Sequence, residues 1–283
     1  MKVVLAGAYG NLGVEILKAL VKEGHEVVAT DYVEKEVDGL DKSKFTFRKA
    51  DITDKVALKG ICDGAEAVIT TVGLTTFSAT VSNYDIDYRG NLNLLEEAKS
   101  SGVKYFSYIS VIRADEAPDV PMVHAKYMFE EELRKSGIQY VIHRPTGYFY
   151  DIVKVFRPMI EKGSVSLLGK KPVSANVIDT PDFAEFIVKS MKDENKIYNV
   201  GGKETYTYEE IANMCFEAAG KEAVIKRAPT WLFTILANLP KNKKNGKWAV
   251  IKFSKFTLSQ DMVGDTVYGD ASFKEYIKKS FSK

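Results

Sequence analysis

The chain has 283 residues, 45% of them apolar, and a formal net charge of +2 at pH 7. This length fits one large domain, or one domain with a small appended lobe, and the near-neutral charge gives no reason to expect nucleic acid as a partner. No apolar run approaches the roughly 20 residues of a membrane-spanning helix, so we expect no integral membrane segment.

Strands and helices alternate over the first half of the chain. In chain order, the patterns predict a strand at 2–6, a helix at 11–22, strands at 26–31 and 45–50, a helix at 54–62, a strand at 65–72, a helix at 84–101, a strand at 104–110, a helix at 124–136 and a strand at 139–143. This α/β alternation predicts a doubly wound parallel sheet, the Rossmann fold. Right-handed crossovers then bring the carboxyl ends of the strands, and a ligand site, to one edge.

The pattern changes after Pro145. The remaining elements predicted are helices at 152–162, 181–192 and 207–219, the last with a capping box of Thr207 and Glu210, and a strand at 197–200 that joins the sheet. We therefore divide the chain into a Rossmann domain at 1–150 and a mixed region at 151–283. The mixed region is expected partly to complete the sheet and partly to form a small C-terminal substrate or lid lobe.

An apolar segment at 231–240 is followed by a Lys-rich loop at 241–247. One interpretation is a helix that lies on a membrane surface or covers an apolar substrate pocket. The other, which we favour, is a helix packed on the core with a solvated basic loop behind it.

A loop with three glycines follows the first strand. It reads Gly7-Ala8-Tyr9-Gly10-Asn11-Leu12-Gly13. Gly7 permits the tight turn, Gly10 lets the backbone approach a pyrophosphate, and Gly13 lets the helix pack closely on the sheet. The N-terminus of the next helix offers N–H groups and its positive dipole end to phosphates. This context favours a dinucleotide site over turn glycines in a cofactor-free domain.

Asp31 ends the second strand, 18 residues after Gly13. A carboxylate there accepts hydrogen bonds from the adenosine ribose hydroxyls and repels a 2′-phosphate. Tyr32, and no Arg or Lys, follows at once, so we predict NAD as the cofactor, with NADP as the alternative. The other interpretation of Asp31 is a solvated loop acid.

Asp51 and Ile52 follow the third strand. The carboxylate is suited to the adenine amino group and the Ile side chain to the adenine face. Asp51 is equally suited to capping the next helix, and Asp54 is a second candidate for that cap.

The GxxGxxG spacing and these acidic positions resemble those of extended and atypical short-chain dehydrogenase/reductases. A second set of residues is similar to the atypical, NmrA-like subgroup, which includes divinyl-chlorophyllide reductases: His124-Ala125-Lys126, Glu130, Leu133, Ser136-Gly137-Ile138 and Arg144-Pro145-Thr146-Gly147-Tyr148-Phe149. Two later stretches, Ile178-Asp179-Thr180-Pro181-Asp182 and Tyr198-Asn199-Val200-Gly201-Gly202, are similar to further blocks of that subgroup. The resemblance covers about residues 1–220 and implies an NAD(P)-binding Rossmann fold.

Typical members of this family carry YxxxK, in which Tyr is the general acid and Lys holds the nicotinamide ribose. Lys126 matches that lysine, but Met122 stands in place of the Tyr, and a thioether cannot donate the proton. Tyr127 lies on a different helical face and does not replace it. The resemblance further implies that the dinucleotide is lined by strand-end residues: Thr70, Thr71, Val72, Gly73, Ser110, Pro145, Thr146 and Gly147.

Two functions stay open. The first, which we favour, is an NAD(P)-dependent oxidoreductase acting on a small organic substrate, and Lys126 supports it. The proton that completes the reduction would come from water or from one of five residues: Tyr84, Tyr88, His124, Tyr148 and Tyr150. For each of these five, a role in packing or at the surface is the more common one. The second is a non-catalytic, NmrA-like dinucleotide sensor or scaffold, which the missing Tyr supports. A nucleotide-sugar epimerase or dehydratase also needs that missing acid and is least favoured.

Cysteine and histidine usage points to a reducing environment without a metal. Cys62 and Cys215 lie far apart with no CxxC pair, and the three histidines show no ligand spacing. We therefore expect a cytoplasmic protein with no metal. We also expect it to be a monomer or homodimer with a small-molecule substrate.

Overall fold

The computed structural model describes residues 1–37, 39–76, 78–244 and 246–282. Within these residues, eight strands form one sheet in the order β12-β9-β6-β5-β4-β1-β2-β3. Their bounds are Lys2–Ala6 (β1), Glu26–Asp31 (β2), Phe45–Lys49 (β3), Ala67–Thr70 (β4), Tyr105–Ile109 (β5), Gln139–Pro145 (β6), Lys196–Gly201 (β9) and Thr266–Val267 (β12). Neighbouring strands from β3 across to β6 run parallel, and Val4 of the central β1 pairs with Val28 and Val68. The predicted Rossmann sheet is confirmed.

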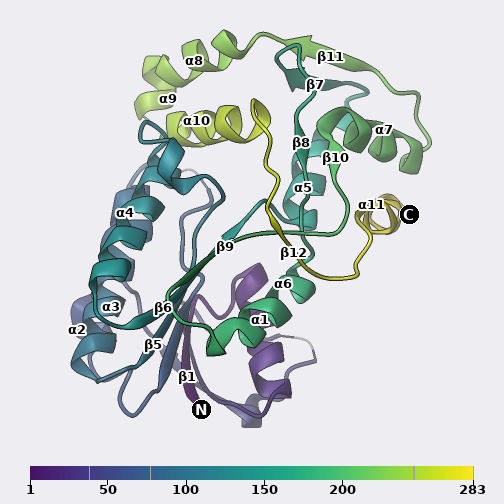
Figure 1. Ribbon diagram of the computed structural model, residues 1–283. Helices are drawn as coiled ribbons and strands as arrows, with labels where there is room; N and C mark the ends of the chain where they lie inside the picture. The colour runs from purple at the N-terminus through teal and green to yellow at the C-terminus, as the bar shows by residue number, and fades with distance from the viewer. Residues whose placement is uncertain (38, 77, 245, 283) are drawn as a thin grey trace. The chain divides into compact units, whose positions relative to one another are not determined.

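Helices cover both faces of this sheet, with α1 on one face and α2, α3 and α4 on the other (Figure 1). Their bounds are Asn11–Lys22 (α1), Lys55–Leu58 (α2), Asn91–Ser100 (α3) and Pro121–Lys135 (α4). Val4 and Phe106 of the strands share one buried apolar cluster with Leu95 of α3 and Phe129 of α4. Because successive strand residues point to opposite faces, the intervening buried residues are left to face α1.

Several predicted boundaries differ from the observed ones. The long helix predicted at 84–101 is a π-helical turn, Tyr84–Gly90, followed by α3. The helix predicted at 124–136 begins earlier, at Pro121, because the fixed φ of proline suits the first position of a helix. Asp54 caps α2 through the N–H groups of Val56 and Ala57, and this helix ends at Leu58.

Contacts divide the described chain into two compact units. The first comprises the described residues of 1–76, 80–144 and 184–198, and the second those of 77–79, 145–183 and 199–283. Elements of the second unit are α5 (Phe149–Glu161), β7 (Val165–Leu168), β8 (Ser174–Ala175), β10 (Tyr206–Thr207), α7 (Tyr208–Ala218), β11 (Ile225–Ala228), α8 (Thr230–Asn238), α9 (Pro240–Lys244), α10 (Lys247–Leu258) and α11 (Phe273–Phe281). Helix α6 (Thr180–Lys189) and β9 belong to both units. Here β7 pairs with β11 and β8 with β10, none of them predicted.

The C-terminal apolar segment differs from the favoured prediction of a core-packed helix. It forms α8, in which Ala237 alone among the described residues of the helix is buried, and α10 lies beside it (Figure 1). The predicted Lys-rich loop is mostly helical, since α9 and the start of α10 occupy it. Among the described residues, no helix combines the length and apolar character needed to cross a bilayer. By contrast, the capping box of Thr207 and Glu210 at α7 is confirmed.

Candidate dinucleotide site

The glycine loop turns sharply between β1 and α1. Gly7 has a φ of +77°, and its N–H and that of Ala8 both donate to the carbonyl oxygen of Thr30 on β2. Gly10 is the N-cap of α1, no side chain caps this helix, and its first turn contains no acidic residue. The amino end of α1 therefore keeps its N–H groups and its positive dipole end available to an anion.

A side chain at either end of the loop would not fit. A Cβ at Gly13 would lie 2.0 Å from the carbonyl oxygen of Gly7, and one at Gly7 would lie 2.5 Å from Oγ1 of Thr71. A Cβ at Gly10 would meet nothing closer than 3.4 Å. Gly7 and Gly13 are thus required by the fold, whereas Gly10 leaves room that the fold itself does not use. This is the arrangement expected where a pyrophosphate approaches the backbone.

Asp31, at the carboxyl end of β2, holds the loop in place. Its Oδ2 accepts a hydrogen bond from the N–H of Tyr9 (3.0 Å) and its Oδ1 one from the N–H of Tyr32 (2.8 Å). Each oxygen keeps a further lone pair for a ribose hydroxyl. Sequence reasoning missed Lys35, whose Nζ donates to the carbonyl oxygen of Tyr9 (3.4 Å) and brings a cation to the same loop.

Asp51 and Ile52 lie after β3, as predicted, in different environments. Asp51 is exposed, and its Oδ1 accepts from the N–H and the hydroxyl of Thr53 (2.9 and 2.7 Å). Ile52 is buried, and a Cβ at Gly90 would lie 2.7 Å from its Cδ1. With the helix cap supplied by Asp54, the second oxygen of Asp51 remains suited to the adenine amino group.

The carboxyl ends of β4 and β5 bring further predicted residues to the same edge of the sheet. Thr71 donates its hydroxyl to the carbonyl oxygens of Ala6 and Gly7, which ties β4 to the glycine loop. Ser110, directly after β5, is buried, and its hydroxyl has no hydrogen-bond partner among the described residues. An unpaired buried hydroxyl is costly, and a bound ligand would satisfy it.

Lys126 forms a buried ion pair that the sequence did not reveal. Its Nζ lies 3.2 Å from Oδ1 of Asp87, and the Asp87 side chain is fully buried. The ammonium also donates to the carbonyl oxygen of Ile109 (3.2 Å). Oδ2 of Asp87 accepts from the N–H of Leu74 (3.1 Å), so it is fixed to the loop after β4. At Gly73, in that loop, a Cβ would lie 2.6 Å from Oδ1 of Asp87 and 3.0 Å from the Nζ.

Asn91 is a second polar residue that sequence reasoning missed. Its Oδ1 accepts from the hydroxyl of Thr70 (2.8 Å), and its Nδ2 donates to the carbonyl oxygens of Val72 (3.2 Å) and Asp87 (3.0 Å). It thus joins the end of β4 to the π-helical turn. Asp87 and Asn91 stand four residues apart on the helix face that continues with buried Leu94 and Leu95. Polar residues on an otherwise apolar helical stripe were the signal that could have found them.

The position of the missing general acid holds no replacement. Met122 is buried on α4. Two of the predicted proton donors come together, because the hydroxyl of Tyr84 lies 3.1 Å from Nδ1 of His124. Desolvation raises the pKa of Tyr84 above its usual value, which opposes loss of its proton. Tyr88 packs against the apolar cluster.

The remaining predicted residues belong to the second unit. Thr146 is buried, donates its hydroxyl to the carbonyl oxygen of Asn176 (2.8 Å) and follows Pro145, the last residue of β6. Tyr148 and Tyr150 stack with ring centroids 5.6 Å apart. Desolvation, then the charges nearby, raises the pKa of Tyr148. Asn176, which Thr146 contacts, and the two stacked tyrosines all belong to the second unit.

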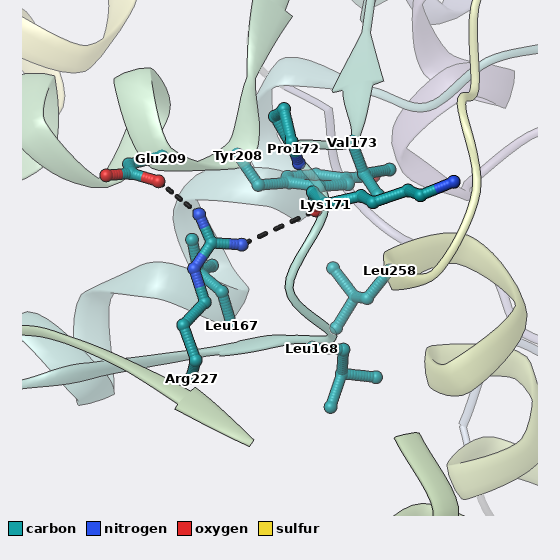
Figure 2. Close-up of a pocket in the computed structure, with 9 residues that line it drawn as sticks. All are labelled: Leu167, Leu168, Lys171, Pro172, Val173, Tyr208, Glu209, Arg227 and Leu258. Carbon is teal, nitrogen blue, oxygen red and sulfur yellow. Dashed lines mark hydrogen bonds and ion pairs between the residues drawn. The ribbon is translucent and has the colours of Figure 1, made fainter. Parts of the chain in front are cut away.

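A small hollow in the second unit has a volume of about 260 Å³, which includes open solvent at its mouth (Figure 2). Leu167, Leu168 and Leu258 form its apolar wall. Arg227 reaches across it, pairs with Glu209 and donates to the carbonyl oxygen of Lys171 (Figure 2). The Arg227 guanidinium in this hollow is therefore already paired with a carboxylate and a carbonyl oxygen.

Comparison with known proteins gives a match along most of the chain. The model of the NmrA-like family matches residues 1–255. The photosystem II assembly factor Ycf39 of Synechocystis sp. is 27% identical over 234 residues, which cover 81% of this chain and 71% of that protein. The divinyl chlorophyllide a 8-vinyl-reductase of Zea mays is 28% identical over 258 residues, covering 80% of this chain and 61% of that protein.

Among solved structures, the NADPH-dependent quinone oxidoreductase of Escherichia coli, solved with NADPH, superposes with a TM-score of 0.75. It is 20% identical, and the match covers 99% of this chain and all of that one. At this level of identity the superposition shows a shared fold.

Proposed function

The chain belongs to the NmrA-like family, and on that premise we propose that it is an NAD(P)-dependent oxidoreductase of the atypical short-chain dehydrogenase/reductase type. In this proposal residues 1–150 bind the dinucleotide, and the region at 151–283 supplies the substrate lobe. The observation that carries it is the buried Lys126–Asp87 pair beside Gly73, which fixes an ammonium group at the carboxyl edge of the sheet.

The residues present fit a dinucleotide at this edge. The space at Gly10 and the uncapped end of α1 suit the pyrophosphate, Asp31 suits the adenosine ribose, and the unpaired hydroxyl of Ser110 lies at the next strand end. When bound, the reduced dinucleotide supplies the hydride. Lys126, oriented by Asp87, would hold the nicotinamide ribose hydroxyls, and Pro145 and Thr146 would border the nicotinamide end.

The substrate class is proposed from the relatives and from the missing acid. A chlorophyllide reductase and a quinone oxidoreductase both act, by their names, on conjugated molecules. Hydride addition to a conjugated system leaves an anion whose charge is delocalised, so water suffices as the proton source. Met122 in place of a Tyr acid is compatible with that chemistry.

The second candidate is a non-catalytic dinucleotide-binding sensor or scaffold. Met122 supports it, and so does the similarity to a protein named as an assembly factor. Both candidates bind the cofactor, and only the oxidoreductase turns it over.

The two cysteines bear on the proposed cell compartment. Cys62 and Cys215 are free and buried, and desolvation raises the pKa of each to about 12. Such thiols are inert and need no oxidising environment. We propose a reducing compartment such as the cytoplasm.

Titration of the chain with NADH and with NADPH tests the function. We expect nicotinamide fluorescence to change on binding, and loss of nicotinamide absorbance when quinones and other conjugated carbonyl compounds are added. Gly10→Ala should keep its thermal midpoint, since its Cβ meets only ordinary contacts, yet bind about tenfold more weakly. Binding without turnover across the panel would select the scaffold, and no binding of either nucleotide would refute both functions.

Asp31→Asn tests the nucleotide preference. The parent should bind NAD more tightly than NADP, because the Asp31 carboxylate repels a 2′-phosphate. In the variant the ratio of NADP to NAD affinity should rise about tenfold, since a neutral amide removes that repulsion. Equilibrium binding of the oxidised forms gives the ratio, with Asp54→Asn, in the α2 cap, as the charge-matched control. A parent that already prefers NADP would contradict the role given to Asp31.

A further inference from the structure

Helix α8 exposes a line of large apolar side chains. Trp231 and Ile235 of α8 and Leu239, the residue that caps its carboxyl end, follow one another at four-residue intervals and are 60%, 52% and 42% exposed. Residues four apart lie on one helix face, so Trp231 and Ile235 form a stripe that Leu239 continues past the end of the helix. In the described part of α8, Ala237 alone is buried and three other apolar residues are half-buried, so the helix leaves a substantial part of its apolar surface exposed.

The charge around this stripe is of one sign. Residues 228–260, which form α8, α9 and α10, contain six lysines and no Asp or Glu. The segment thus carries +6, against +2 for the whole chain, so the rest of the protein carries −4. A near-neutral total charge conceals a strongly basic segment.

Lysines stand next to the apolar stripe. Lys255 of α10 reaches α8, where its Nζ donates to the hydroxyl of Thr234 (2.9 Å). Thr234 is exposed and adjoins Ile235. Lys241 and Lys243 are exposed directly after the stripe ends. The surface therefore presents an apolar line with cations along one edge and at one end.

We propose that α8, with the lysines of α9 and α10, docks the protein on the surface of an anionic lipid bilayer. A helix of nine residues is about 13 Å long, too short to span a bilayer but suited to lie in its interface. Tryptophan favours the headgroup level, aliphatic side chains enter the acyl boundary, and lysines attract anionic headgroups. An acidic protein would pair with the lysines, but it would also need an apolar groove shaped to bind the stripe. A bilayer offers anionic headgroups to the lysines and acyl chains to the stripe, and it needs no such groove.

Vesicle binding of the full chain tests this. Flotation with phosphatidylcholine vesicles, with and without phosphatidylglycerol, should show binding to the anionic vesicles at low salt and loss of binding at high salt. In a Trp248→Phe variant, whose only tryptophan is Trp231, the fluorescence should shift to the blue on adding these vesicles.

Variants separate the two contributions. Trp231→Ala with Ile235→Ala should weaken binding about tenfold or more, and Val56→Ala, an exposed apolar residue on α2, should not. Lys241→Glu with Lys243→Glu should weaken it more than about tenfold, since each lysine near an anionic surface contributes about fivefold. Lys22→Glu with Lys99→Glu, exposed in the first unit, is the charge-matched control.

Three outcomes would overturn the proposal. The first is no binding to the anionic vesicles at low salt. The second is binding that the stripe variant leaves unchanged. The third is self-association of the chain without lipid that the stripe variant abolishes, which would assign the surface to a second copy. The substituted residues are exposed except Trp248, which is half-buried, and circular dichroism checks that each variant is folded.

Discussion

Lys126→Met is expected to lower the free energy of unfolding by about 3–5 kcal/mol, as does removal of one member of a buried ion pair elsewhere. The Asp87 carboxylate is fully buried 3.2 Å from Nζ of Lys126, and the variant leaves that charge without its cation. Hydrogen bonds from Leu74 and Asn83 reach only the other carboxylate oxygen. Urea unfolding at neutral pH measures the effect.

The double variant Lys126→Met, Asp87→Asn is the informative comparison. Removing both charges should restore much of the lost stability, because no uncompensated charge remains buried. It should not restore dinucleotide binding, since the proposed contact to the nicotinamide ribose is gone. If the separate effects of Lys126→Met and Asp87→Asn simply add in the double variant, the pair is not coupled, and the positioning role of Asp87 is wrong.

Acid should destabilise the protein through His143. Desolvation of this fully buried side chain lowers its pKa from 6.5 to about 3. The unfolded chain therefore takes up a proton below pH 6.5 that the folded chain does not take up until about pH 3. The contribution of the neutral His143 side chain to the free energy of unfolding is complete above pH 6.5. It decreases as the pH falls, and at pH 5 it is lower by about 2 kcal/mol.

His143→Gln isolates this effect. The variant should be less stable than the parent at pH 7.5, because the imidazole ring packs against Phe186 and Tyr198. Between pH 7.5 and pH 5, however, its free energy of unfolding should fall by about 2 kcal/mol less than that of the parent. Ser107→Ala is the control: it removes the hydroxyl 3.3 Å from Nδ1 but keeps the buried imidazole, and with it the full pH dependence. Equal pH slopes for the parent and His143→Gln would contradict the assignment.

Local signals predicted the first half of the fold well. Strands β1 and β2 and helix α1 occur with the bounds predicted, because glycines and a strict change of period separate them. The region after Pro145 was predicted less completely. Strands β8 and β10 have two residues each, and so short an element has no period of its own.

The amino-acid sequence by itself determined the Rossmann sheet and the glycine loop with Asp31 beside it, because alternating apolar runs and a tight turn at Gly7 are properties of neighbouring residues. Only the tertiary structure decided that Asp87 pairs with Lys126, that Asn91 ties β4 to the π-helical turn and that α8 exposes its apolar side. Such pairings join residues some 20 to 40 positions apart on different elements, and burial depends on what packs against a helix. Neither the pairing of distant residues nor the burial of a helix face can be predicted from the periodicity of a single segment.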